Sequence, residues 1–235
     1  MPGWSHQERV CELRRTVLPL VGNQVDVIGT DGGIDVIGED RKDIALEVRI
    51  TAYAPTKDKA EQLLHQVKIA TGSTIRDEGP HASGFFTRSG YSANYRLHVP
   101  RHLSGRFHTE NGGVEVQGLD GVLHPETTNG GLTLKDLAGD VHATTVNGGV
   151  HITLAGESWN GAGLSARSTN GGISVTAPDG YSAHLVAKTV NGGVNVGFPV
   201  TVQGTIKNDL DSNLGKGGPT IRLETVNGGV SISRN

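Results

Sequence analysis

The feature that most constrains this chain is a repeated tripeptide, Asn-Gly-Gly, which recurs from residue 111 onward. Its asparagines are Asn111, Asn129, Asn147, Asn170, Asn191 and Asn227. The first two spacings are 18 residues, and the later spacings of 23, 21 and 36 residues read as the same period with insertions. A fixed period of this size is typical of repeat proteins, in which each unit packs only against its neighbours.

Apolar residues recur at fixed positions around each asparagine. Positions three and five after it are apolar in all six repeats, as in Val114 and Val116, and positions six and four before it are mostly apolar or small. Polar residues fill most of the columns between. This alternation predicts two strands per repeat, joined by an Asn-Gly-Gly turn. An earlier variant, Asp31-Gly32-Gly33, follows the same pattern.

Such repeats suit either a hairpin meander or the coils of a solenoid. A constant period with identical inward columns favours the solenoid, because like residues then stack about 4.8 Å apart along its axis. One coil buries about five apolar side chains, which does not offset the entropy of ordering 18 residues at about 1–2 kcal/mol each. We therefore predict an all-β chain: a β-solenoid (β-helix) of about seven coils of about 18 residues.

The first hundred residues follow a different pattern. The sequence predicts strands over 44–53, 67–76 and 91–99, one helix over 56–67 with Thr56 as its cap, and a mobile loop over 81–84. We divide the chain into an N-terminal extension (1–20), a first coil with a capping subdomain that contains the helix (21–100), and the repeat solenoid (101–235). Residues 209–219 are expected to cap the far end.

Composition narrows the possible functions. The 35 glycines show no three-residue period, which excludes collagen, and the abundant Val and Ile oppose disorder. A formal charge of −3 argues against nucleic acid as a partner. No apolar run reaches 18 residues, so we expect no membrane span, and the N-terminus lacks the apolar region of a signal peptide. The single Cys11 permits no internal disulfide.

The recurring Thr-x-Asn-Gly-Gly-Val-x-Val motif, the preceding strands with one helix, and the ending from Gly217 to Val230 carry a resemblance. Over residues 20–235 the chain resembles the bacterial β-strand-repeat family known as "putative adhesins", which carries a domain of unknown function. The resemblance implies a β-solenoid in exported proteins of the periplasm, cell envelope or extracellular space.

A row of hydroxyl residues stands two positions before each asparagine: Thr109, Thr127, Thr145, Ser168, Thr189 and Thr225. Such a row on the surface would suit ice or a glycan. Alternation with the apolar columns instead predicts that these side chains point inward, where the hydroxyls and the Asn amides satisfy backbone groups of the turns. The glycine pairs are likewise interpreted as turn residues, since a strand rather than a helix follows each of them.

Histidine offers the best candidates for metal chemistry. His124 and His142 share an outward column and should stack in adjacent coils. Two histidines can hold zinc or copper weakly, whereas a firm site needs three or four ligands. Our expectation is therefore no metal and no other cofactor, with solvated surface histidines as the favoured interpretation.

Catalytic motifs are absent from the sequence: it has no Gly-x-Ser-x-Gly, no His-Glu-x-x-His and no Walker loop. The candidate binding residues lie in the insertions between repeats instead. Trp159 and Asn160 lie in a five-residue insertion, and Asp209 begins the last long one. Insertions in solenoids often gather on one face, so these three are candidate ligand contacts, although Trp159 folding back over the sheet is the favoured alternative.

We therefore predict a non-catalytic interaction scaffold at the cell surface or envelope, with a protein or glycan ligand. The first alternative is a carbohydrate-active lyase or hydrolase on a β-helix, which would need convergent carboxylates or bases in a cleft. The second is a solenoid that self-associates end to end.

Overall fold

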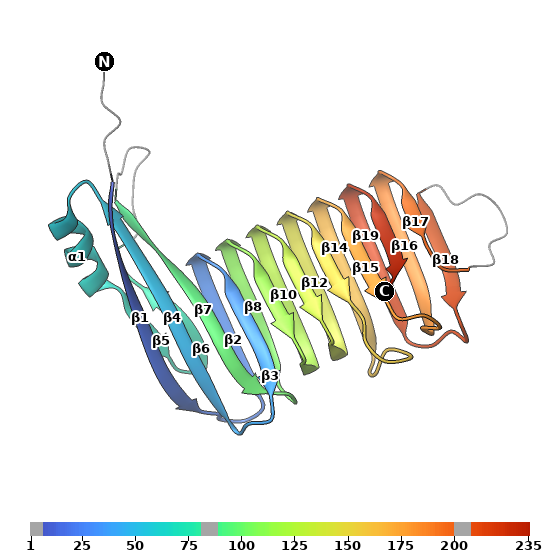
Figure 1. Ribbon diagram of the computed structural model, residues 1–235, viewed down its shortest axis with the longest axis horizontal. Helices are drawn as coiled ribbons and strands as arrows, with labels where there is room; N and C mark the ends of the chain where they lie inside the picture. The colour runs from blue at the N-terminus through green and yellow to red at the C-terminus, as the bar shows by residue number, and fades with distance from the viewer. Residues whose placement is uncertain (1–6, 81–88, 200–207) are drawn as a thin grey trace, which may run out of the picture.

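The computed structural model describes residues 7–80, 89–199 and 208–235. These residues form twenty strands and one helix. The strands make two large open sheets of ten strands each, which face each other along an elongated molecule (Figure 1). The chain is therefore mainly β, as predicted. The loop expected over 81–84 lies outside the described residues.

Each repeat contributes one strand to each sheet. The first sheet, called sheet A, contains the strands after the turns: β3 (Ile34–Glu39), β9 (Val114–Gln117), β11 (Leu132–Lys135), β13 (Val150–Thr153), β15 (Ile173–Ala177), β17 (Val194–Val196) and β20 (Val230–Arg234). Sheet B contains the strands before them: β2 (Gln24–Asp31), β8 (Ser104–Asn111), β10 (Asp120–Asn129), β12 (Ala138–Asn147), β14 (Gly163–Asn170), β16 (Ala183–Asn191) and β19 (Thr220–Asn227). All these strands pair in parallel, with Asn opposite Asn.

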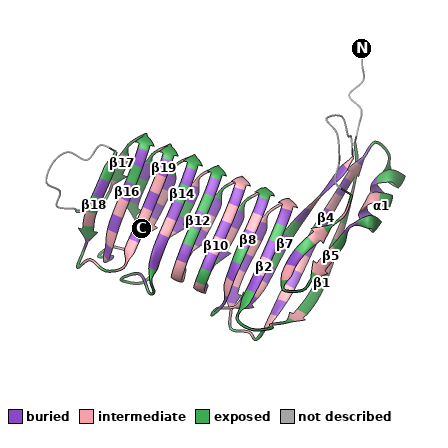
Figure 2. Cartoon of the chain, turned by 180° about the vertical axis from the view of Figure 1, so that it is seen from behind, coloured by how far each residue is buried: buried purple, intermediate pink, exposed green. Residues whose placement is uncertain are grey.

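The core lies between the two sheets. Burial alternates along every repeat strand, so that purple bands cross each sheet in Figure 2. The inward columns are partly buried at Val194 and Val196 of β17 and buried in the other repeats, for example Leu132 and Leu134 in β11. Parallel pairing aligns equal positions of neighbouring repeats, so these apolar side chains form continuous rows.

The order of the repeats in space differs from their order in sequence. The strand that follows β14 in sheet B is β19, and β16 comes after it. The last repeat of the chain is thus inserted between the two repeats that precede it. Every repeat carries the same inward columns and the same turn, so the pairing pattern alone does not distinguish these neighbours.

The N-terminal part widens both sheets. In sheet A, β1 (Glu8–Pro19), β4 (Asp43–Ala54) and β7 (Gly90–Pro100) pair antiparallel, and β7 joins the first repeat strand β3. In sheet B, β5 (Lys68–Thr71) and β6 (Thr74–Glu78) form a hairpin beside β2. Residues 8–19, which belong to the expected N-terminal extension, form β1 and pair with β4 over their whole length. Whether an edge strand forms depends on its neighbours in the sheet more than on its own sequence.

The helix α1 (Lys57–Gln66) packs against β1 and β4 through its buried residues Ala60 and Leu64. Arg14 of β1 fixes the end of the helix, because its Nη1 donates a 2.6 Å hydrogen bond to the carbonyl of Val67. Thr56 stands at the N-cap position, but its side chain makes no capping hydrogen bond. The cap function predicted for Thr56 is therefore wrong, although the helix forms where expected.

At the opposite end, β18 (Asp209–Leu214) pairs antiparallel with β16 and forms the edge of sheet B. Its own Leu210 and Leu214 are buried. The segment within the longest repeat spacing thus lies against the repeat of β16 and β17, at the end of the sheet.

Candidate functional site

The asparagines of the turns form a single hydrogen-bonded ladder along one edge of the molecule. Asn129 Nδ2 donates to Asn111 Oδ1 at 2.9 Å, and Asn147 Nδ2 donates to Asn129 Oδ1 at 2.9 Å. The first member is Asp31, whose Oδ1 accepts from Asn111 at 2.8 Å. A carboxylate fits there because the end of the ladder only has to accept. These side chains are exposed, but their amides are largely occupied with one another.

The row of hydroxyls lies inside the molecule. Thr109, Thr127, Thr145, Ser168, Thr189 and Thr225 are all buried. Each hydroxyl donates to the carbonyl of the first turn glycine in the neighbouring repeat, as Thr145 does to Gly130 at 2.9 Å. Burying a carbonyl without a partner is costly, so this row stabilises the turns. It presents no hydroxyl to a surface ligand.

The two histidines of the candidate metal site stack face to face. The ring centroids of His124 and His142 lie 5.4 Å apart with an interplanar angle of 11°. Imidazole lone pairs lie in the ring plane, so near-parallel rings at this separation do not aim at one ion. Among the described residues no group of three or more His, Cys, Asp or Glu could hold a metal ion. His142 instead lies 3.0 Å from Asp140, Nε2 to Oδ1.

The candidate contacts in the insertions do not form one surface. Trp159 is only 5% exposed, and its Nε1 donates a 3.0 Å hydrogen bond to the carbonyl of Gly139. It folds back over the core and is not available to a ligand. Asn160 is exposed beside it, and Asp209 is exposed at the start of β18, on the far edge of sheet B.

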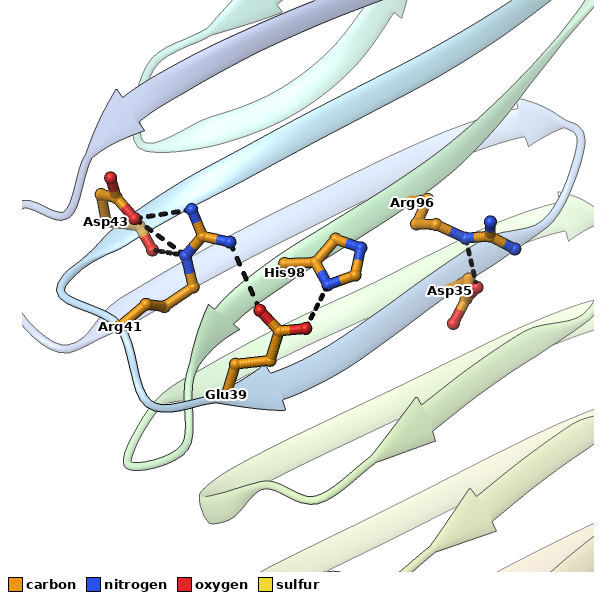
Figure 3. Close-up of polar contacts among 6 residues, drawn as sticks. All are labelled: Asp35, Glu39, Arg41, Asp43, Arg96 and His98. Carbon is orange, nitrogen blue, oxygen red and sulfur yellow. Dashed lines mark hydrogen bonds and ion pairs between the residues drawn. The ribbon is translucent and has the colours of Figure 1, made fainter.

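The outward face of sheet A carries a chain of charges near the N-terminal end (Figure 3). Arg41 bonds to Asp43 at 2.8 Å, Nε to Oδ1, and lies 3.5 Å from Glu39. Glu39 in turn meets His98 Nδ1 at 2.7 Å. Farther along, Arg96 Nε donates to Asp35 Oδ2 at 2.8 Å, which raises the pKa of the Arg96 guanidinium. Each of these six side chains therefore makes a hydrogen bond or an ion pair with another of the six.

The repeat pattern and the motifs of the sequence do not single out these charged residues. The signal that could have found them is the alternation of β3 and β7, which places Asp35 and Arg96 on the same outward face. Their contact still depends on β7 pairing with β3, from 61 positions away in the sequence. No local pattern predicts that pairing.

A buried polar cluster joins the two sheets at the same end. Asp77 of β6 accepts hydrogen bonds from the hydroxyls of Tyr91 and Tyr95, at 2.8 and 2.7 Å. Burial, with the carboxylate beside it, raises the pKa of both phenols far above the usual value. The shift keeps both tyrosines neutral donors, so this cluster is a clamp between β6 and β7.

One arrangement resembles a catalytic triad. His184 lies 2.8 Å from Asp211 through Nε2 and 3.3 Å from the hydroxyl of Thr220 through Nδ1. The Asp211 side chain, however, is 74% exposed. A solvated carboxylate on the edge strand does not hold the imidazole in one orientation, as an acyl-transfer site requires.

A shallow groove crosses the outward face of sheet B. It has a volume of about 390 Å³ and runs over β12, β14, β19 and β16. One side carries Arg167, Glu224 and Lys188, and the other carries the exposed side chains of Val226 and Val190. Arg167 pairs with Glu224 at 2.8 Å, which lowers the pKa of that carboxyl. Lys188 makes no ion pair with any residue that the structure describes. We take this surface, the sheet B groove, as the candidate binding site.

Comparisons with known proteins agree with the architecture. The model of the family described as Toastrack DUF4097 matches residues 103–233. The crystal structure of a putative cell adhesion protein from Clostridium sporogenes is similar with a TM-score of 0.55 and 12% identity, over 96% of this chain and all of that one. A putative adhesin from Bacteroides fragilis gives a TM-score of 0.45 and 14% identity, over 95% of this chain and 97% of that one. No curated protein matches the sequence.

The similarity to the first structure concerns the fold alone, because the identity is low. Within the described residues, no helix has the length and apolar character needed to cross a membrane.

Proposed function

Because this chain belongs to the Toastrack DUF4097 family, we propose that it is a non-catalytic interaction scaffold, exported to the cell envelope or surface. The repeats would then form a β-solenoid of seven coils, counting the Asp31 variant with the six Asn-Gly-Gly repeats. The neighbouring structure from Clostridium sporogenes, described as a putative cell adhesion protein, supports this direction.

The observation that carries the proposal is the sheet B groove. It combines exposed valines with a lysine that is not engaged by a described carboxylate, on a rigid face whose backbone groups are paired within the sheet. Exposed apolar side chains beside unpaired charge are features of binding surfaces. The ligand would be a protein or glycan recognised through side chains.

Two measurements test the proposal. Fractionation of the source organism should find the protein outside the cytosol, against cytosolic and envelope markers. The purified, labelled chain should bind isolated envelopes saturably, and the double variant Lys188→Glu with Val226→Asp should weaken that binding at least about tenfold.

Arg49→Glu is the matched control, because Arg49 is an exposed cation on the outward face of sheet A. It should leave envelope binding unchanged. A cytosolic protein that does not bind envelopes would overturn the scaffold proposal, and equal losses in both variants would exclude the sheet B groove as its site.

A further inference from the structure

The N-terminal end of the solenoid core needs a cover, and α1 supplies only part of it. Strand β4 has 12 residues and spans roughly 40 Å, whereas the 10 residues of α1 span about 15 Å. The helix packs on β4 and β1, where Ala60 and Leu64 are buried. More than half the length of these strands therefore extends beyond the helix.

A pocket of about 520 Å³ opens between the two sheets in this uncovered part. Its floor is apolar and belongs to the core: Val25 of β2, Ile44 of β4 and Ile75 of β6 are each less than 5% exposed. Its mouth lies between two segments. One is the end of β1 at Leu18 with Leu20 of the β1–β2 connection, and the other is the turn of the β5–β6 hairpin at Gly72. Ligand sites in proteins have volumes of this order and mainly apolar walls.

The mouth carries a second, independent signal. Residues 17–21 are five consecutive apolar residues, of which the last four line the pocket. Val21 is 84% exposed there, whereas Val17, 61% exposed, lies on the outward side of β1. Alternation along β1 places Thr16 on the inward side with Arg14 and Leu18, yet Thr16 is exposed. Exposed apolar runs beside an apolar cavity mark a surface that binds an apolar partner.

The polar part of the rim restricts the charge of that partner. It consists of Gln24, Asp26, Thr71 and Ser73, and the residues that line the pocket include no lysine, arginine or histidine. Asp26 accepts from Gln24 Nε2 at 3.1 Å and from the Arg106 backbone at 3.0 Å. Asp26 is the one ionisable side chain among the residues that line the pocket, so the rim repels an anionic head group and suits one that donates hydrogen bonds.

We propose that this pocket binds the acyl chain of a single-chain amphiphile with an uncharged, hydroxyl-bearing head. The chain lies against Val25, Ile44 and Ile75, and the head lies at the rim near Gln24 and Asp26. The site is separate from the sheet B groove, so its failure would leave the scaffold proposal standing.

The test uses the full chain and the neutral fluorophore N-phenyl-1-naphthylamine. Fluorescence should rise saturably, and 1-monododecanoylglycerol should displace the probe. Each buried methylene is worth about a factor of four, so 1-monooctanoylglycerol should compete at least 100-fold more weakly, by order of magnitude. Dodecanoate should compete about tenfold more weakly than the neutral dodecanoyl compound, because of its charge near Asp26.

The variant Gly72→Trp fills the mouth with little risk to folding, since a Cβ at Gly72 meets no atom within 4 Å. Gly193→Trp is the matched control, because Gly193 is equally open and lies next to β17 at the far end. Gly72→Trp should lower affinity for the probe at least about tenfold, and Gly193→Trp should leave it within twofold.

Three outcomes would overturn the proposal. The first is no saturable fluorescence, and the second is the same affinity in Gly72→Trp and the unsubstituted chain. The third is binding to phosphatidylcholine vesicles without competition by the monomeric amphiphile, which would make residues 17–21 a membrane contact instead.

Discussion

Asn227 donates its side-chain amide to Asn170 Oδ1 at 2.8 Å, across 57 positions of sequence, while Asn191 donates to Asn227 from the other side. The last repeat of the chain is thus locked between two earlier ones. The same order holds in both sheets, since β20 lies between β15 and β17.

This inserted order can be measured with spin labels on the outward face of sheet B. Ser165 is the register partner of Arg222, and Arg222 is the partner of Val186. Labels at 165 and 222 should therefore be about one strand spacing apart at the backbone, roughly 4.8 Å, and labels at 165 and 186 about two. Dipolar broadening should be stronger for the first pair. The reverse result would mean that the repeats stack in sequence order.

The amide ladder predicts that its interior members cannot be acidic. Asn129→Asp removes the donor to Asn111 and places a carboxylate against that oxygen. Chemical denaturation should show a loss of about 1–3 kcal/mol in the free energy of unfolding. Asp31→Asn is the control, because the end position only accepts a hydrogen bond and should change by less than about 0.5 kcal/mol. Equal effects at both sites would contradict a directional ladder.

The buried hydroxyls are expected to stabilise the turns. Thr145→Val conserves shape but leaves the carbonyl of Gly130 without its 2.9 Å partner. We expect a destabilisation of about 1–3 kcal/mol in urea unfolding. The neighbouring Thr144 is exposed on the outward face, so Thr144→Val should fall within about 0.5 kcal/mol of the unsubstituted chain. An unchanged urea midpoint for Thr145→Val would contradict a structural role for this row of hydroxyls.

The two glycines of each turn should differ sharply in their tolerance of a side chain. A Cβ on Gly130 would lie 2.0 Å from the carbonyl oxygen of Gly112, whereas on Gly131 its nearest neighbour would be 3.3 Å away. Gly130→Ala should therefore cost at least about 3 kcal/mol and Gly131→Ala less than about 1 kcal/mol. Thermal unfolding of the two variants provides the comparison, and equal costs would show that the stack can shift to admit a Cβ.

Stability should fall at alkaline pH because of buried tyrosines. Burial raises the pKa of Tyr181 to about 12, and the pKa of Tyr95 lies higher still. Above pH 10 the unfolded chain loses phenolic protons that the folded chain keeps. The free energy of unfolding therefore falls by up to about 1.4 kcal/mol per pH unit for each such tyrosine. Urea unfolding between pH 8 and 11.5 should be less pH-dependent in Tyr95→Phe, and an identical slope would contradict the burial effect.

Much of the fold can be predicted from the sequence because the features of each repeat depend on residues that are close together in the chain. Alternation fixed which residues face inward, and the glycine pairs located the turns; for example, Val150 and Ile152 face the core on either side of His151. The helix near residues 57–66 was also predictable from its composition. These properties depend on near neighbours in the chain.

The binding surfaces were less predictable. The two histidines were correctly placed next to each other, but a stacked pair offers no common point for a metal. Trp159 lies in an insertion, where the sequence allows either a ligand contact or the favoured position folded back over the sheet, and its burial and its hydrogen bond to Gly139 show the second. The sheet B groove depends on Lys188 and Glu224 becoming neighbours through the inserted repeat.

The sequence by itself determined the repeat unit: its two strands, its inward columns and its turn. Tertiary structure alone decided the order of the last three repeats, the pairing of β1 with β4 and the opening beyond α1. The physical reason is that identical columns make every repeat an equally good partner for the others. The choice among them depends on the connections, the edge strands and the end caps, which act only once the chain has folded.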